Sequence, residues 1–321
     1  MRARFQKVII LVAVLVVVPA ALGWVLAGAP AAAAVPVGVI VTMVVSSSAG
    51  RAVAGTSLLV LMGVGFAAAL TATGWWWVLL IAGTAGVAGW LIDPRHPVGL
   101  GAAMLNVTLI ACTTHQQPDL RSALIFGVFI GVGGAAGMTL AAVLARRNAA
   151  PQPPPIQLRI EHSLVRAATY AVAVGASGAI GVALGWDRAY WVPMTTVVLG
   201  QAVLAQQRDR IPARVVGTVL GTVVVVPLLG LIAPTAAYGI VGLIVLIVAL
   251  TIGTTPYWRF SMLLSASIVM LLAPDASSAI NGVGGQRLWG TCIGAAVVAS
   301  VVWLAGRRAT NLSTGARNIT P

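Results

Sequence analysis

Apolar runs of about twenty residues follow one another along most of the chain, and short segments rich in glycine, proline or charge separate them. A helix needs about 20 apolar residues to cross a bilayer, with a range of roughly 17–25. Twelve runs meet this requirement, and we predict a membrane-spanning helix for each. They are residues 8–28, 31–47, 52–71, 75–92, 97–114, 122–145, 163–185, 190–206, 213–233, 236–254, 257–273 and 286–305.

One separating segment is longer and more polar than the others. It reads RRNAAPQPPPIQLRIEH at residues 146–162, and a proline-rich sequence of this kind is typical of a stiff linker. We therefore predict a first six-helix membrane repeat over residues 1–145, a cytoplasmic linker over 146–162, a second six-helix repeat over 163–306 and a cytoplasmic tail over 307–321. The remaining loops are too short to hold a soluble domain.

The composition agrees with a membrane protein. Of the 321 residues, 59% are hydrophobic and 8% are charged, whereas a soluble domain carries about 25% charged residues. We therefore predict an all-α integral membrane fold with the lipid bilayer as a partner. The net charge of +13 comes from basic residues in short loops, so no nucleic-acid partner is expected. With both termini in the cytoplasm (N-in, C-in), all of the 19 lysines and arginines except Arg121, Arg188 and Arg287 lie inside, as the positive-inside rule requires.

The first 34 residues allow two interpretations. A basic start, an apolar core and the small residues AGAPAAAA are features of a cleavable signal peptide. The second half has a matching helix at 163–185 after its own basic segment, so we predict that residues 8–28 form a retained helix.

The two halves resemble copies of one another. Pro36 in VPVGVIVTMV aligns with Pro193 in WVPMTTVVLG, and each half ends in a double arginine. Because six helices is an even number, both copies insert the same way round, as in transporters built from parallel repeats. We therefore predict about twelve helices arranged as two parallel six-helix repeats.

One motif, Arg-x-x-Gly-Thr-x-x-Gly, occurs at residues 214–221 and again at 287–294. Glycines four residues apart let membrane helices approach closely. We therefore expect the third and sixth helices of each repeat to form an inner layer, with the arginine of each motif near the start of its helix.

Four arginines at helix starts are candidate anion-binding residues. Arg51 and Arg214 head the third helix of each repeat and are expected at the cytoplasmic face. Arg121 and Arg287 head the sixth helix and are expected at the outer face. A guanidinium beside the backbone N–H groups of a helix start can bind an anion. For Arg51 and Arg214 a simpler interpretation stays open, because inside arginines also orient helices and extend to lipid headgroups.

Few polar side chains lie within the predicted spans. Thr195, Thr196 and Gln201 follow Pro193 within about two turns, and a proline inside a helix frees a backbone carbonyl. Interrupted helices with polar neighbours form substrate sites in transporters. Asn106 is a further candidate because a polar residue in mid-span is costly and often functional. We expect these four polar side chains to contact a substrate midway across the membrane.

The sequence contains no pattern typical of an enzyme. No carboxylates are paired within a span, and His-Glu-x-x-His, Gly-x-Ser-x-Gly and aspartate-rich metal motifs are absent. Cys112 and Cys292 lack metal-type spacing, and the single lysine, Lys7, follows no Walker A loop. We predict no catalytic residue, no metal, no cofactor and no ATP hydrolysis by this chain.

The stretch YWVPMTTVVLGQ at 190–201, followed by DRIPARVVGTVLG at 209–221, resembles the signature of the fusaric acid resistance (FUSC), or aromatic acid exporter-like, family. The residues that carry the resemblance are Tyr190, Trp191, Pro193, Thr195, Arg214, Gly217, Thr218 and Gly221. It covers residues 163–305 well and 8–145 more weakly. The resemblance implies export of aromatic or other organic acids across a bacterial inner membrane. Larger exporters of this family carry a soluble domain between their halves, where this chain has only the linker.

We therefore predict a multi-pass inner-membrane exporter of organic anions, with aromatic carboxylic acids as expected substrates. A passive anion channel on the same scaffold, or a non-transporting membrane partner in envelope assembly, are the alternatives. The sequence leaves open the identity of the substrate, the energy source and whether the chain forms a homo-oligomer.

Overall fold

The computed structural model describes nine continuous stretches and a few single positions. The stretches are residues 13–27, 74–92, 120–145, 160–186, 188–200, 204–232, 237–252, 256–272 and 279–317. The single positions lie between 34 and 63 and between 104 and 112. Three predicted spans, 31–47, 52–71 and 97–114, therefore fall mostly outside the described residues.

Every element in these stretches is a helix. In the first half they are η1 (Ala13–Val17, a π-helical turn), α2 (Val18–Ala27), α5 (Trp75–Leu91) and α7 (Leu120–Ala145). The remainder are α8 (Ile160–Ala183), α9 (Trp191–Gly200), α10 (Leu204–Val219), η2 (Leu220–Val225), α11 (Val226–Ile232), α12 (Tyr238–Ile252), α13 (Tyr257–Leu272), η4 (Ala279–Gly284) and α15 (Gly285–Arg317). The prediction of an all-α chain is confirmed for the described residues, and each of the six helices predicted in the second half coincides with a helix.

Four of the described helical segments are long and apolar enough to cross a membrane. They are Leu124–Val143, Ser163–Ala183, Asp209–Leu231 and Gly282–Leu304. The shorter apolar helices are Val14–Gly23, Trp75–Leu91, Trp191–Gly200 and Tyr257–Leu272. These lengths support a multi-pass membrane protein; twelve spans and their orientation stay predictions.

The chain divides into two compact units, Met1–Gly175 and Ala176–Pro321, and α8 contributes to both. In the first unit, two glycines of α7 let the backbone at Val35 and Val39 lie close to that helix. A Cβ atom on Gly133 would collide with the carbonyl oxygen of Val35, and one on Gly137 would collide with that of Val39. Thr42 adds a hydrogen bond across this contact, because its hydroxyl donates to the carbonyl oxygen of Gly134 at 2.8 Å.

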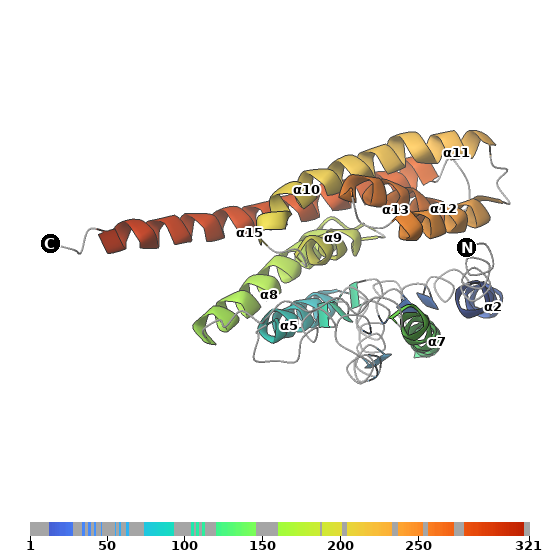
Figure 1. Cartoon of the computed structure of the whole chain (residues 1–321), viewed down its shortest axis with the longest axis horizontal. Helices are drawn as coiled ribbons and strands as arrows, with labels where there is room; N and C mark the ends of the chain where they lie inside the picture. Colours follow the sequence, from blue (N-terminus) through green and yellow to red (C-terminus); the bar gives the residue numbers. More distant parts are fainter. Residues whose placement is uncertain are drawn as a thin grey trace. The chain divides into compact units, whose positions relative to one another are not determined.

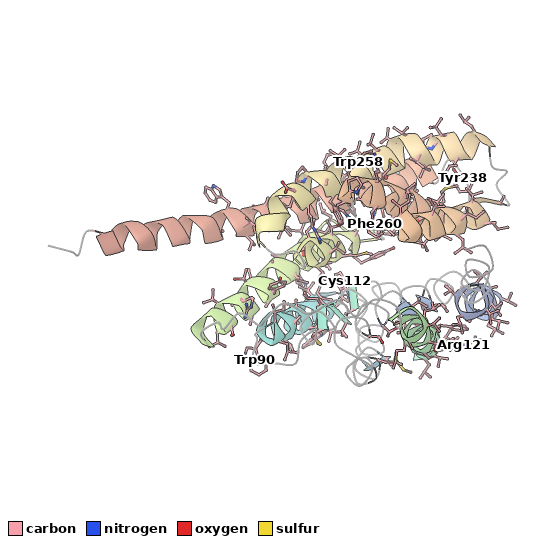
Figure 2. All side chains as sticks on the ribbon, in the orientation of Figure 1. Trp90, Cys112, Arg121, Tyr238, Trp258 and Phe260 are labelled. Atoms are coloured by element: carbon pink, nitrogen blue, oxygen red, sulfur yellow. The ribbon has the colours of Figure 1, made fainter. Side chains whose placement is uncertain are left out.

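In the second unit, α12 packs on α13, α13 packs on α10, and α15 packs on both α9 and α10 (Figure 1). Tyr238 lies at the start of α12, and Trp258 and Phe260 lie at the start of α13 (Figure 2). The side chains of Val223, Leu228 and Leu231 on the α10–η2–α11 rod are exposed, as expected for a helix that faces lipid.

Two prolines explain local features of these helices. Pro227 has no N–H group to donate to the carbonyl of Val223, and its ring crowds that carbonyl. The π-helical turn η2 (Leu220–Val225) overlaps this position, and such wide turns occur where the regular hydrogen-bond ladder is interrupted. Pro193 differs from its predicted role. It is the third residue of α9, where a helix needs no N–H donor, so it starts the helix instead of breaking it.

The turn between α8 and α9 sets the position of the aromatic residues that follow. Gly185 has φ of 62°, a left-handed conformation that glycine adopts without strain, and its N–H donates to the carbonyl of Val182 at 3.0 Å. Further turn hydrogen bonds, from the N–H of Ala189 to the carbonyl of Trp186 and from that of Trp191 to the carbonyl of Arg188, lead into α9. Tyr190 and Trp191 are thereby held at the beginning of the helix.

Candidate anion-binding site

The motif at 287–294 brings α15 against α9. A Cβ atom on Gly290 would lie 2.6 Å from the Cβ of Trp191, and one on Gly294 would lie 2.7 Å from the carbonyl oxygen of Val192. Real Cβ atoms do not approach other heavy atoms this closely, so only glycine fits at both positions. The later glycine of α15 meets a later residue of α9, so the two helices run in the same direction.

The motif at 214–221 repeats this arrangement with α13 as the partner. A Cβ atom on Gly217 would lie 2.5 Å from the carbonyl oxygen of Trp258, and one on Gly221 would collide with the carbonyl oxygen of Met262. Helices α10 and α13 also run in the same direction. The two copies of the motif therefore build two equivalent close contacts between helices in one unit.

Arg214 is buried between α10 and α13, with 1% of its surface exposed. Its Nη1 donates to the hydroxyl of Ser261 at 3.5 Å, and that hydroxyl donates to the carbonyl oxygen of Arg214 at 3.2 Å. The Nε–H group of Arg214 is buried and has no partner among the described residues. One turn further on, the hydroxyls of Thr218 and Ser265 lie 3.2 Å apart and extend this polar contact.

Arg287 is fully buried among aromatic and sulfur groups. Its guanidinium carbon lies 4.0 Å from the centre of the Trp191 ring, which is a cation–π contact. Its Nη1 lies 3.9 Å from the sulfur of Met194. Trp191 in turn stacks on Tyr190, with ring centres 5.1 Å apart and planes inclined by 20°. The Nε and Nη2 groups of Arg287 have no hydrogen-bond partner in the part of the chain that the structure describes.

The two arginines belong to one site, which we call the Arg214–Arg287 site. Helices α10 and α15, which carry the two arginines, pack together, and the positive charge of Arg214 acts against that of Arg287. No carboxylate of a described residue forms a salt bridge with either arginine, and Asp209, the acidic residue of α10, is exposed. An unpaired buried charge is costly, so this arrangement favours a bound anion.

Other buried polar atoms of the second unit also lack partners. The Nε1 group of Trp191 and the hydroxyls of Thr195, Thr222 and Thr291 are buried without a hydrogen bond to any described residue. Thr195 and Thr291 each lie one helical turn beyond an aromatic or basic residue of the site, at the i+4 position from Trp191 and Arg287. These groups can offer hydrogen bonds to a polar ligand.

The predicted contact residues have different environments. Arg214, Arg287 and Thr195 are buried in the second unit with unpaired polar atoms. Thr196 is also buried, but its hydroxyl donates to the carbonyl of its own helix at Val192 (3.2 Å) and faces that of Gly294 at 3.5 Å, which is a helix-packing role. The remaining predicted residues Arg51, Gln201 and Asn106 lie outside the described residues.

Both arginines have buried side chains, whereas the sequence predicted them at the two mouths of a pathway. Arg287 is the third residue of α15, and its side chain lies against Trp191 of α9. Arg214 is the eleventh residue of α10, and its side chain lies against Ser261 of α13. Each arginine thus extends toward a neighbouring helix, and its position across the membrane stays a prediction.

Arg121 does not occupy a position like that of Arg287. Arg287 stands three residues before the first glycine of its pair, and the residue three before Gly133 in α7 is Ile130. Ile130 is fully buried in an apolar cluster. The buried members of that cluster are Ala34, Val107, Phe126 and Ile130. Arg121 is the second residue of α7 and is exposed. Among the described residues, the position three before the glycine pair therefore holds a buried arginine in α15 and a buried isoleucine in α7.

Three residues that contact the arginines were not predicted as site residues, namely Trp191, Met194 and Ser261. The signal for Trp191 was present: it precedes the conspicuous Thr195 by four residues and so shares its helix face. Ser261 carried no comparable signal, because its role depends on which helix packs against α10.

We predict that the ring of Trp191 is needed for the geometry of Arg287. A desolvated cation–π contact is worth about 2 kcal/mol, so Trp191→Leu should weaken anion binding by about 10-fold or more. Trp191→Phe keeps a ring and should lose less. Binding of benzoate to the purified variants, measured by titration calorimetry, checks this order. Equal affinities for the Leu and Phe variants would contradict it.

Comparison with known proteins agrees with the motifs. Residues 173–301 match the family model described as fusaric acid resistance protein-like, which covers less than half of the chain. Neither the comparison with curated proteins nor that with solved structures found a match. The resemblance to the fusaric acid resistance proteins is therefore confirmed over residues 173–301, the stretch that carries both arginines of the Arg214–Arg287 site.

Proposed function

We propose that this chain is a membrane transporter that exports organic anions, with aromatic carboxylates as its substrates, across a bacterial inner membrane. The observation that carries this proposal is the Arg214–Arg287 site: two buried guanidinium groups without a described carboxylate partner, next to the stacked rings of Tyr190 and Trp191. The match to the fusaric acid resistance protein-like family supports transport as the activity.

The chemistry of the site suits an aromatic acid. A carboxylate accepts paired hydrogen bonds from a guanidinium. The unpaired N–H groups of Arg214 and Arg287 are the available donors. An aromatic ring attached to that carboxylate can pack against the edge of the Trp191 ring and against Met194. Thr195 would contact the substrate beside them, and Gln201 and Asn106 are further contacts in the proposal.

The proposal includes the predicted architecture. Twelve helices in two parallel repeats would enclose the pathway, with both termini in the cytoplasm. In this arrangement Arg51 would attract anions at the cytoplasmic face and Arg121 would act at the outer face. The parallel directions of α9 with α15 and of α10 with α13 are those that regular alternation of six spans requires, which supports the proposed order of the second six helices.

The experiment is transport by purified protein in liposomes loaded with radiolabelled benzoate. We expect protein-dependent loss of benzoate, inhibited by other aromatic carboxylates and not by benzamide, which has the same ring without the charge. Recordings in planar bilayers separate the two transport modes, because large benzoate currents would indicate a passive channel. Absence of any flux from well-folded protein would contradict the proposal and favour a non-transporting role in the envelope.

A further inference from the structure

We infer that the Arg214–Arg287 site takes a dianion, an aromatic ring that carries two carboxylates, in preference to a monocarboxylate. This inference rests on the proposed function and specifies the substrate class of the same site. The geometry behind it is the presence of two buried guanidinium groups from two packed helices, each with N–H donors left unpaired.

The two positive charges of the site favour a doubly charged ligand. Arg214 and Arg287 contribute two positive charges, and no described carboxylate pairs with them. Charge in a water-poor interior is strongly destabilising unless it is compensated. A monocarboxylate compensates one of the two charges and leaves the other buried, whereas a dicarboxylate compensates both. The dianion should therefore bind more tightly even when the ring is the same.

The surroundings of the two arginines differ in a way that also favours an aromatic dicarboxylate. Arg287 lies against the ring of Trp191 and the sulfur of Met194, so its side of the site suits the ring and the carboxylate attached to it. Arg214 lies against the hydroxyl of Ser261, and the hydroxyls of Thr218 and Ser265 follow one turn later. The site is thus apolar and aromatic at one arginine and polar at the other. A ring bound at Arg287 would direct a second carboxylate toward Arg214.

The two arginines accordingly have different tasks. Arg287 binds the carboxylate that every substrate carries, and Arg214 binds the second carboxylate and determines the preference for a dianion. Replacement of Arg214 should remove the preference for the dianion. Replacement of Arg287 should weaken binding of both ligands.

The test compares benzoate with isophthalate, which is the same ring with a second carboxylate, by titration calorimetry at pH 7.5 on the full-length protein in detergent micelles. For the unmodified protein we expect a dissociation constant at least about 10-fold lower for isophthalate, with one ligand bound per chain. For Arg214→Gln we expect the two constants to become equal within about 2-fold. For Arg287→Gln we expect both ligands to bind at least about 10-fold more weakly.

The outcomes separate this inference from the proposed function. Equal affinities of the unmodified protein for benzoate and isophthalate, or two benzoate ions bound per chain, would overturn the dianion inference and leave anion transport standing. Binding of neither ligand would overturn both. Because the first comparison uses the unmodified protein, the inference can be rejected even if a variant fails to fold.

Discussion

Replacement of Arg287 by glutamine should abolish most benzoate export without reducing the stability of the protein. A hydrogen-bonded contact with a charged group contributes about 1.5–3 kcal/mol, and Arg287 offers such contacts to a bound carboxylate through its unpaired N–H groups. Loss of about 2 kcal/mol corresponds to an export rate about 30-fold lower. Benzoate efflux from proteoliposomes at matched protein content measures this effect.

The stability of Arg287→Gln distinguishes a ligand-binding role from a structural one. An unpaired buried charge destabilises the empty protein, so its removal should leave the melting temperature unchanged or raise it. An arginine that served only to hold helices together would give a lower melting temperature. Arg259→Gln is the matched control, because Arg259 is exposed at the start of α13 and lies over the ring of Trp258 at 5.4 Å. It removes the same charge and should leave export within about 2-fold of the unmodified rate, as surface substitutions usually have small effects.

Alanine at Gly217 or Gly290 should destabilise the second unit. The new methyl group would lie 2.5 Å from a backbone carbonyl oxygen of Trp258 in the first case and 2.6 Å from the Cβ of Trp191 in the second. Backbone and Cβ atoms cannot rotate away, so the helices must separate. Such overpacking costs about 1–3 kcal/mol. Thermal unfolding of the purified variants in detergent should show a lower melting temperature and, for Gly290→Ala, weaker binding of benzoate.

A glycine without close neighbours serves as the control, and its replacement should not lower the melting temperature. Gly239 lies in α12, and a Cβ atom there would meet nothing within 4 Å. Alanine is favoured over glycine inside a helix by about 0.8–1.0 kcal/mol, so Gly239→Ala should be neutral or stabilising. A melting temperature for Gly217→Ala as high as that of Gly239→Ala would contradict the close contact between α10 and α13.

Helix positions in the second half of the chain were predictable because long apolar runs leave few other choices. The predicted span 163–185 corresponds to α8 at Ile160–Ala183, and 257–273 corresponds to α13 at Tyr257–Leu272. The glycine spacing also predicted close contacts between helices, and Gly217 and Gly290 make such contacts with α13 and α9. An inner layer formed by the third and sixth helices stays a prediction. The length of the apolar runs determines where the helices lie, and the spacing of the glycines determines where helices can approach closely.

The depth and partners of the site could not be predicted from the sequence. Hydropathy places Arg287 at the start of a span, but whether a long side chain extends outward to lipid or inward to another helix depends on the face that the neighbours cover. The contact between Arg287 and Trp191 joins residues nearly one hundred positions apart in the sequence. The correspondence of Ile130, not Arg121, with Arg287 also required the contacts of Gly133, because both α7 and α15 contain several glycines.

Direct binding of an aromatic carboxylate to the purified protein tests the central claim, that the buried arginine pair is an anion site. The most informative measurement is a benzoate titration of the unmodified protein beside the double variant Arg214→Gln/Arg287→Gln, with Arg259→Gln as the control. We predict saturable binding to the unmodified protein and the control, and no detectable binding to a folded double variant. Binding of equal affinity to all three proteins would contradict the assignment of the site.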